Sequence, residues 1–379
     1  MDATSETSNG ALSRLLHREL LALLVLTAMA IGVYLGTREL AAVHRRLRVT
    51  DAAHWFRIGR AELAAGRPLA AVASLRRASL IDPPNHHYRL TLASALEAGG
   101  ETHAARQVLL DLRALTPEYP EINLRLARLD RDRGDHTAAV RYYQNAIYGV
   151  WPEDAVDFRR SLRLEFIRYL LERQHTDRAL SELLAIEANL GRDADTHAEA
   201  GQLFLQAGDA ARALAHYRLA LRQDSNHEDA LAGAGTAAFT LGDYAAAQRY
   251  LRRVPERRAD VTEARSIAAF VLARDPLLPR LPYAERRRRL EMNLSHTATR
   301  LAACTPTADS SVNVADLRAR IEAARAGLRR SRIRQLETIE DGVDLIHRVQ
   351  QEAGIRCGTP ALPDRALLLI GERHRLDTP

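Results

Sequence analysis

Residues Gly233 to Ala238 are the first stretch whose types and spacing could do chemistry. They read Gly-Ala-Gly-Thr-Ala-Ala, which matches the spacing of a dinucleotide-binding fingerprint. That fingerprint must follow a strand, and the residues before Gly233 do not predict one. The stretch also falls in register with a helical repeat described below. We therefore interpret it as part of a helix and not as a cofactor site.

Histidines are the second candidate for chemistry. His227 and Glu228 begin like the motif of zinc proteases, but Leu231 occupies the position of the second histidine. His86 and His87 are adjacent, yet the fourteen histidines are scattered along the chain, which is typical of solvated side chains. The sequence has no phosphate-binding loop, no nucleophile elbow and no Cys-x-x-Cys pair. The motifs predict no enzyme activity, no metal and no cofactor.

The middle of the chain is organised by a repeat of 34 residues. A small residue at Gly59 returns as Ala93 and then as Ala127, and the pattern resumes after one insertion of six residues. Other positions repeat at the same step: Ala71, Ala105, Ala139, Ala179, Ala213 and Ala247, and the glycines Gly66, Gly100, Gly134, Gly208 and Gly242. Self-similarity at a fixed period of this length predicts a helical solenoid.

Each repeat predicts two helices, A and B, joined by a tight turn. In the first repeat, helix A is expected at about 52–65 and helix B at about 68–80. Gly66 lies where helix A must end, because glycine adopts the left-handed conformation common there. Gly59 and Ala71 are small, so the two helices can approach closely. One repeat cannot bury its apolar face alone, so neighbouring repeats must stack.

In these positions the chain resembles the tetratricopeptide repeat (TPR) family. The resemblance covers about 52–260, in about six copies. It implies an all-α fold, a TPR helical solenoid. The fourth copy departs most, since Ile167 stands where a small residue is expected and the turn glycine is missing.

The resemblance also implies a binding surface. In TPR proteins, positions two, five, nine and twelve of helix A line the concave face, and a partner protein or peptide binds there. The binding residues that we expect on this basis are Phe56, Arg60, Leu90, Ser94, Leu124, Arg128, Arg131 and Gln202. Further positions of the same kind are Leu63, His87, Glu97, Glu121, Asp195, Ala198, Leu205, Asp229, Thr236 and Phe239. The asparagines of the family's peptide-carboxylate clamp are not matched, and Phe56 and Leu90 also suit simple packing.

The N-terminal region predicts a membrane anchor. Residues 1–19 are polar and predict a flexible tail, whereas Leu20–Gly36 carries no charge. That run makes about 25 Å of helix, close to the ~30 Å hydrocarbon core of a bilayer. We expect a transmembrane helix at 20–37 and a helical stalk at 38–51. The alternative is a cleaved signal peptide, since Ala28-Met29-Ala30 has the shape of a cleavage site.

Orientation in the membrane has evidence on both sides. More arginines follow the anchor than precede it, which favours a cytoplasmic domain. A short N-terminal tail and the two cysteines, Cys304 and Cys357, favour export, because an even pair permits a disulfide. Two unrelated thiols are the alternative. We expect a single-pass protein of a bacterial inner membrane whose large domain is exported.

The region 276–379 predicts a separate helical domain after the solenoid and its capping helix, which together span 52–275. A helix is expected at 283–303, and apolar stripes follow at 317–328 and 336–346. These stripes form either one long helix with a stutter or two helices with a turn near 329–332. A disulfide needs Cα atoms within about 7 Å, so pairing of the cysteines predicts the turn. A last apolar run, 366–370, should dock as a short element.

One charge feature exceeds the background. Residues 280–334 hold thirteen arginines and five acids, and Arg286–Arg289 is the densest run. A solvated helix face is the usual explanation, and contact with anionic lipid headgroups is the functional alternative. No aromatic residues alternate with these arginines, which argues against nucleic acid as a partner.

The pattern as a whole predicts a membrane-anchored protein–protein interaction scaffold that binds its partner on the concave TPR face. An enzyme or enzyme accessory subunit, with its activity in the C-terminal helical domain, is the alternative. That region offers few nucleophiles or metal ligands, and convergent carboxylates or histidines in a pocket there would favour it.

Overall fold

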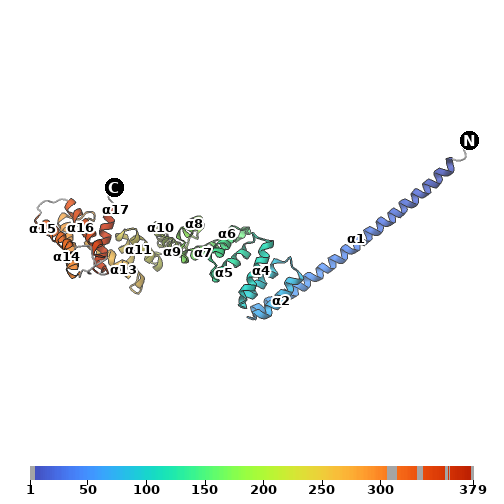
Figure 1. Cartoon of the computed structure of the whole chain (residues 1–379), viewed down its shortest axis with the longest axis horizontal. Helices are drawn as coiled ribbons and strands as arrows, with labels where there is room; N and C mark the ends of the chain where they lie inside the picture. Colours follow the sequence, from blue (N-terminus) through green and yellow to red (C-terminus); the bar gives the residue numbers. More distant parts are fainter. Residues whose placement is uncertain (1–4, 305–313, 331–335, 355–356, 358, 377–379) are drawn as a thin grey trace. The chain divides into compact units, whose positions relative to one another are not determined.

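The structure is a computed structural model that describes residues 5–304, 314–330, 336–354, 357 and 359–376. Every regular element among these residues is a helix. The first, α1 (Ser5–Ala64), is continuous through the predicted anchor and stalk and becomes helix A of the first repeat (Figure 1). The sequence predicts a flexible tail over 1–19, and the helix from Ser5 onward differs from that prediction. Ala and Leu at 11, 12, 15 and 16 favour a helix, and elongation of an existing helix costs far less than nucleation.

The repeats form pairs of antiparallel helices, as the spacing predicts. After α1 the helices are α2 (Pro68–Ile81), α3 (His86–Ala98), α4 (Thr102–Leu115), α5 (Pro120–Asp132), α6 (His136–Ile147), α7 (Val156–Glu172), α8 (Thr176–Ile186), α9 (Ala194–Gln206), α10 (Ala210–Gln223), α11 (Glu228–Thr240) and α12 (Tyr244–Leu251). Short 3-10 turns η1 (Glu153–Ala155), η2 (Glu187–Asn189) and η3 (Ala259–Val261) occur in the connections.

The turn between helices A and B depends on one left-handed residue. The five turn glycines have φ between 70° and 89°. In the fourth repeat Gln174 occupies this position with φ of 60°, so the turn is kept without glycine. Asp209 follows its glycine and caps helix B, because its carboxylate accepts the backbone N–H of Arg212 at 2.9 Å. That hydrogen bond lowers the pKa of Asp209.

Small residues allow the two helices of a repeat to approach closely. A Cβ at Gly59 would lie 2.5 Å from Cγ of Leu75, and a Cβ at Gly235 would overlap Leu251 in the same way. Leu75 and Leu251 are fully buried, so these leucines fill the space that the glycines leave. The predicted role of the small positions is confirmed by this packing.

The chain divides into two compact units, which we call unit 1 (Met1–Arg159) and unit 2 (Arg160–Pro379). The division falls inside the predicted solenoid, next to the six-residue insertion between α6 and α7. Unit 1 contains the first three repeats, and unit 2 contains the later repeats and the C-terminal helices.

The C-terminal helices pack directly on the end of the solenoid within unit 2. They are α13 (Thr262–Arg274), α14 (Tyr283–Ala303), α15 (Val314–Arg330), α16 (Leu336–Gly354) and α17 (Leu362–Leu376). Helix α13 contacts α12 on one side and α17 on the other, so it covers the last repeat as predicted. The apolar run 366–370 docks as part of α17.

Cys304 and Cys357 form a disulfide in the structure, with Cα atoms 4.9 Å apart. The bond links Cys304, at the end of α14, to Cys357, in the connection between α16 and α17. Helices α15 and α16 are separate helices, which agrees with the geometric argument that a paired cysteine requires a break. Residues 331–335, which include part of the predicted turn at 329–332, are outside the described residues.

Candidate binding surface

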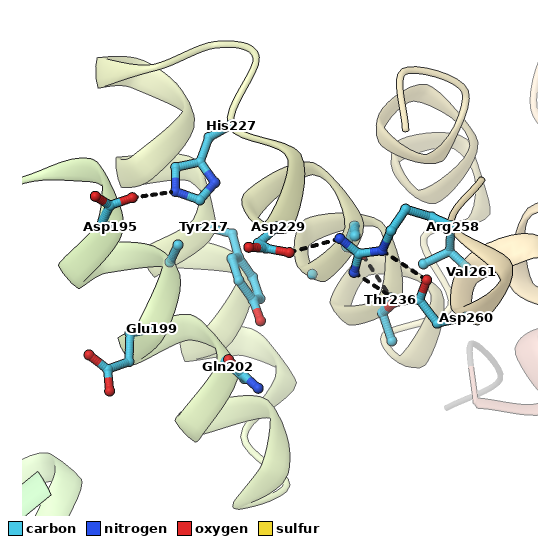
Figure 2. Close-up of a pocket in the computed structure, with 13 residues that line it drawn as sticks. Asp195, Glu199, Gln202, Tyr217, His227, Asp229, Thr236, Arg258, Asp260 and Val261 are labelled. Atoms are coloured by element: carbon cyan, nitrogen blue, oxygen red, sulfur yellow. Dashed lines mark hydrogen bonds and ion pairs between the residues drawn. The ribbon is translucent and has the colours of Figure 1, made fainter. Parts of the chain in front are cut away.

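A cavity of about 460 Å³ opens between α9, α11 and the loop after α12; we call it the unit 2 cavity (Figure 2). Helix A residues of the fifth and sixth repeats supply most of its wall. The lining residues are Asp195, Ala198, Glu199, Gln202, Tyr217, His227, Asp229, Ala232, Gly233, Thr236, Arg258, Asp260 and Val261. Five of these are helix A positions that the resemblance assigns to the concave face: Asp195, Ala198, Gln202, Asp229 and Thr236.

Tyr217 reaches the unit 2 cavity with the end of its side chain. It comes from α10, a helix B, and its ring passes between two glycines to reach the cavity. A Cβ at Gly201 would lie 2.9 Å from Cδ1 of the ring, and a Cβ at Gly233 would overlap Cζ and the hydroxyl. Gly233 is therefore small because it makes room for Tyr217, which explains the resemblance of 233–238 to a nucleotide fingerprint without a nucleotide.

Ion pairs arrange the acidic residues of this cavity. Arg258 donates from Nη1 to Asp229 at 2.8 Å, and from Nε and Nη2 to the two oxygens of Asp260 at 2.9 and 2.8 Å. These bonds lower the pKa of Asp260 and raise that of Arg258. One guanidinium thus crosses the mouth of the cavity between two carboxylates (Figure 2).

His227 has a structural role at the same cavity. Its Nδ1 accepts the backbone N–H of Ala230 at 3.3 Å, so it caps the first turn of α11. An accepting Nδ1 leaves the proton on Nε2, which therefore donates to Asp195 at 3.0 Å. The ring thereby joins α9 to α11. Among the described residues no group of three or more His, Cys, Asp or Glu side chains is placed to hold a metal ion.

A second cavity, of about 760 Å³, lies in unit 1 between α3, α5 and the insertion; we call it the unit 1 cavity. Its lining residues are Glu97, Thr102, Glu121, Leu124, Arg125, Arg128, Leu129, Arg131, Asp132, Trp151 and Phe158. All four helix A positions predicted in the third repeat are among them, and Glu97 is the one contributed by the second repeat.

Charges in the unit 1 cavity are paired with one another. Arg125 donates to the hydroxyl of Ser94 at 2.6 Å and lies 3.7 Å from Glu97 and 3.5 Å from Glu121. Burial raises the pKa of Glu97, and the nearby arginines offset only part of that effect. Arg131 donates to Asp132 at 2.9 Å and to the hydroxyl of Tyr143 at 3.3 Å.

The eight predicted binding residues separate into two groups in the structure. Leu124, Arg128 and Arg131 line the unit 1 cavity, and Gln202 lines the unit 2 cavity. Ser94 lies just behind the unit 1 cavity, where it holds Arg125.

The three residues nearest the N-terminus line neither of these two cavities. Phe56 is 8% exposed and its ring lies 4.7 Å from that of Tyr88, centroid to centroid. Arg60 covers the same ring at 5.8 Å, and Leu90 is 3% exposed. The packing alternative that the sequence left open for Phe56 and Leu90 is the one that the structure adopts.

Several cavity residues were not predicted, among them two from outside helix A and two from the region of the six-residue insertion. Tyr217 comes from a helix B, and Arg258 comes from a loop. Trp151 and Phe158 belong to the insertion and its following helix, and their rings lie 5.1 Å apart. The six-residue break in the period was the available signal for this aromatic pair.

The arginine run 286–289 is largely engaged in internal hydrogen bonds. Arg286 donates to the carbonyls of Leu281 (3.0 Å) and Pro276 (2.9 Å). Arg289 donates to the carbonyls of Leu272 and Asp275, and Arg288 binds both oxygens of Glu285. Arg289 thus closes the C-terminal end of α13 and Arg286 bonds the loop after it, and lipid contact by the run stays a prediction.

A buried polar cluster links three C-terminal helices. Asp364 accepts from Nε2 of His296 at 2.9 Å and lies 3.5 Å from Arg300. Burial alone would raise the pKa of Asp364, but His296 and Arg300 more than offset this and lower it. Gln350 of α16 joins the cluster through Nε2, which lies 3.4 Å from Asp364. Its members bond to one another across α14, α16 and α17, so we assign the cluster a structural role.

The fold and its two lined cavities define a helical-repeat protein of the kind that presents a surface to other molecules. Sequence profiles described as tetratricopeptide repeat match residues 90–155, 164–228 and 204–269. The solenoid is therefore built of tetratricopeptide repeats, and the last matched segment extends into α13. No curated protein matches the chain.

Solved structures with the same repeats are similar to this chain at low identity. YrrB, a TPR protein with an unusual peptide-binding site, is 17% identical with a TM-score of 0.41, over 50% of this chain and 95% of its own. The C-terminal part of a TPR repeat-containing protein from Cytophaga hutchinsonii is 13% identical with a TM-score of 0.43, over 63% and 94%. PilW, a type IV pilus biogenesis factor, is 15% identical with a TM-score of 0.38, over 57% and 98%.

Proposed function

We propose that this protein is a membrane-anchored scaffold that binds a partner protein along the helix A face of its repeats. The observation that carries the proposal is that predicted helix A positions of successive repeats converge on two open cavities. Both cavities offer charged and polar groups at their mouths. Residues of this kind fix the register of a bound polypeptide, whereas a packed core would be apolar.

The anchor rests on the composition and exposure of α1. Leu26–Ala64 contains a segment long and apolar enough to cross a membrane, and none of that segment is buried against the rest of the chain. Leu26 is 60% exposed and Ile31 is 59% exposed. Such a surface is costly in water, and a bilayer would cover it. The disulfide supports an exported domain at a bacterial inner membrane, because disulfides persist in oxidising compartments.

Alkaline extraction of membranes tests the anchor. We expect the chain to stay in the membrane pellet, and the double variant Leu26→Arg/Ile31→Arg to move to the supernatant. Each arginine costs about 3 kcal/mol at the centre of a membrane helix. Leu47→Arg, at an equally exposed stalk position, is the control and should remain in the pellet. Extraction of the unchanged protein by alkali would contradict the anchor.

Affinity purification from detergent-solubilised membranes tests partner binding. A specific partner should co-purify with the full chain and be lost on Gln202→Arg, which adds a bulky charge inside the unit 2 cavity. Ala215→Arg is the matched control, because Ala215 is exposed on α10 and does not line the cavity. Equal recovery of every co-purifying protein with both variants would contradict binding at the helix A face of unit 2.

A further inference from the structure

We propose that the unit 2 cavity recognises a cationic side chain, arginine or lysine, on an extended segment of the partner protein, with the hydroxyl of Tyr217 as one of its acceptors. This inference rests on the proposed scaffold function and specifies the chemistry of the partner. Three independent observations support it: the state of the Tyr217 hydroxyl, an internal comparison between repeats, and the charge of the cavity wall.

The hydroxyl of Tyr217 lines the cavity without a hydrogen-bond partner among the described residues. Tyr217 is 4% exposed, so only the end of its side chain reaches the cavity, between Gln202 and Thr236 (Figure 2). Its oxygen is not among the fully buried side-chain atoms that lack a hydrogen-bond partner, so it is accessible from the cavity. The hydroxyl is therefore available to a polar ligand as a hydrogen-bond partner.

An equivalent tyrosine shows which group satisfies this position. Tyr143 stands sixteen residues after Ala127, as Tyr217 stands sixteen after Gly201, so the two occupy the same place in their repeats. The hydroxyl of Tyr143 accepts a hydrogen bond from the guanidinium of Arg131 at 3.3 Å. In the fifth repeat Leu205 takes the place of Arg131, and the guanidinium is missing. A guanidinium from the partner would restore the same hydrogen bond.

The wall of the unit 2 cavity favours a cation. Four carboxylates line it, those of Asp195, Glu199, Asp229 and Asp260, against the single guanidinium of Arg258. Asp195 and Glu199 each use one carboxylate oxygen in an ion pair within the protein: Oδ1 of Asp195 with His227, and Oε1 of Glu199 with Arg168. Their second oxygens remain available to a partner. An anionic segment would instead meet these carboxylates at close range and be repelled.

The cavity also shows that a guanidinium fits its acceptors. Arg258 reaches Asp229 and Asp260 with three donor atoms at 2.8 to 2.9 Å. This fork geometry is the one by which arginine binds carboxylates in complexes. Burial, together with the charge of Asp229, raises the pKa of Tyr217, so its hydroxyl stays protonated and neutral beside an incoming cation.

Fluorescence anisotropy with the full chain in detergent tests the inference. The probe is a fluorescein-labelled nonapeptide of alternating arginine and serine, and its matched control carries citrulline in place of arginine. Citrulline keeps the shape of the side chain and removes the charge. We expect the arginine peptide to bind at least tenfold more tightly than the citrulline peptide, as a charged hydrogen bond predicts.

Two conservative variants separate the cavity from general charge attraction. Tyr217→Phe keeps the ring between its glycines and should weaken the arginine peptide about tenfold. Tyr143→Phe removes the equivalent hydroxyl in unit 1 and should leave the affinity unchanged. Gln202→Arg adds a cation to the cavity and should weaken binding by more than tenfold. Thermal melts of each variant confirm folding.

The inference is overturned if Tyr217→Phe binds like the unchanged protein, or if the citrulline peptide binds equally well. Its failure can be told apart from failure of the scaffold proposal. A co-purifying partner that is lost on Gln202→Arg, together with no arginine-peptide binding, rejects the cation and keeps the scaffold. Arginine-peptide binding that depends on Tyr217 supports the cation even where no partner has been purified.

Discussion

In the unit 1 cavity three arginines lie among three carboxylates, whereas in the unit 2 cavity one arginine lies among four. Both cavities are lined by positions two, five and nine of a helix A, from the third repeat in unit 1 and from the fifth repeat in unit 2. The difference therefore comes from the side chains that project from a shared backbone. Unit 1 also adds an aromatic pair from its insertion, and unit 2 has none in its cavity.

Tyr143 and Tyr217 show how the polar groups of the two cavities differ. In unit 1 the arginine that could meet a ligand is bonded to the protein's own tyrosine. In unit 2 the corresponding tyrosine has its hydroxyl at the cavity and leucine replaces the arginine. Unit 1 uses its charges mainly for its own packing, and unit 2 leaves polar groups available to a partner.

Removal of the disulfide should produce the largest difference between the unfolding free energies of the two units. The bond closes a sequence separation of 53 residues in unit 2, and its loss should cost unit 2 about 4 kcal/mol of unfolding free energy. Trp55 and Trp151, the only two tryptophans, both lie in unit 1 and report it alone. Urea unfolding of Cys304→Ser/Cys357→Ser should shift the circular dichroism transition and leave the tryptophan transition unchanged. A shift in both would show that the units do not unfold separately.

Loss of a buried ion pair should lower the unfolding free energy more than loss of an exposed one, and this is the second largest effect that we expect. Asp130 of α5 is fully buried and binds Arg106 with both oxygens, at 2.7 and 3.1 Å. Asp130→Ala leaves that arginine without its partner and should destabilise unit 1 by about 3 kcal/mol. Asp229→Ala removes a pair whose carboxylate is 74% exposed and should cost unit 2 less than about 1 kcal/mol. Equal losses, measured by tryptophan fluorescence and circular dichroism, would contradict this assignment.

The turn of the fourth repeat predicts a smaller, stabilising change. Gln174 holds φ of 60°, where the other repeats have glycine. Gln174→Gly should stabilise unit 2 by about 1 kcal/mol, because glycine reaches this conformation without steric cost. Gly208→Gln, at the equivalent turn of the fifth repeat, should destabilise it by a similar amount. Thermal melts of the two variants should move in opposite directions, and a shared direction would reject the turn argument.

The pH dependence of unit 2 should be the smallest effect. Burial lowers the pKa of His197, with a further contribution from His216, and burial also lowers that of His347. Both imidazoles are therefore more easily protonated in the unfolded chain, whose histidine pKa is about 6.5. Their stabilisation is complete above that pH and is lost as pH falls below it. The urea midpoint of unfolding should be lower at pH 5.5 than at pH 7.5, and His197→Asn should make this difference in midpoint smaller. The same difference in the variant as in the unchanged protein would contradict the role of His197.

The sequence predicted the fold because the repeat states the same information six times. The small positions, the turn glycines and the apolar residues of each copy agree, so helix boundaries such as Pro68 and Tyr283 follow closely. The helix break and the cysteine pair were linked by geometry alone. The helix over residues 5–19 was not predicted, because a polar composition says little about a helix that elongates from an apolar neighbour.

The candidate cavities could be predicted only in part. Positions such as Gln202 and Arg128 follow from the repeat, because helix A always presents the same face. Tyr217 could not be found in this way, since its access depends on a missing side chain at Gly233 in the next repeat. The burial of Phe56 could not be predicted from its helix A position, because it depends on Tyr88 across the repeat boundary.

Site-specific photocrosslinking in cells tests the central claim most directly. A photoreactive amino acid would replace Gln202, inside the unit 2 cavity, or Ala215, exposed on α10 outside it. We expect a covalent adduct from position 202 with the same protein that co-purifies with the chain, and none from position 215. Adducts of equal yield from both positions, or from position 215 alone, would contradict binding of a partner at the helix A face.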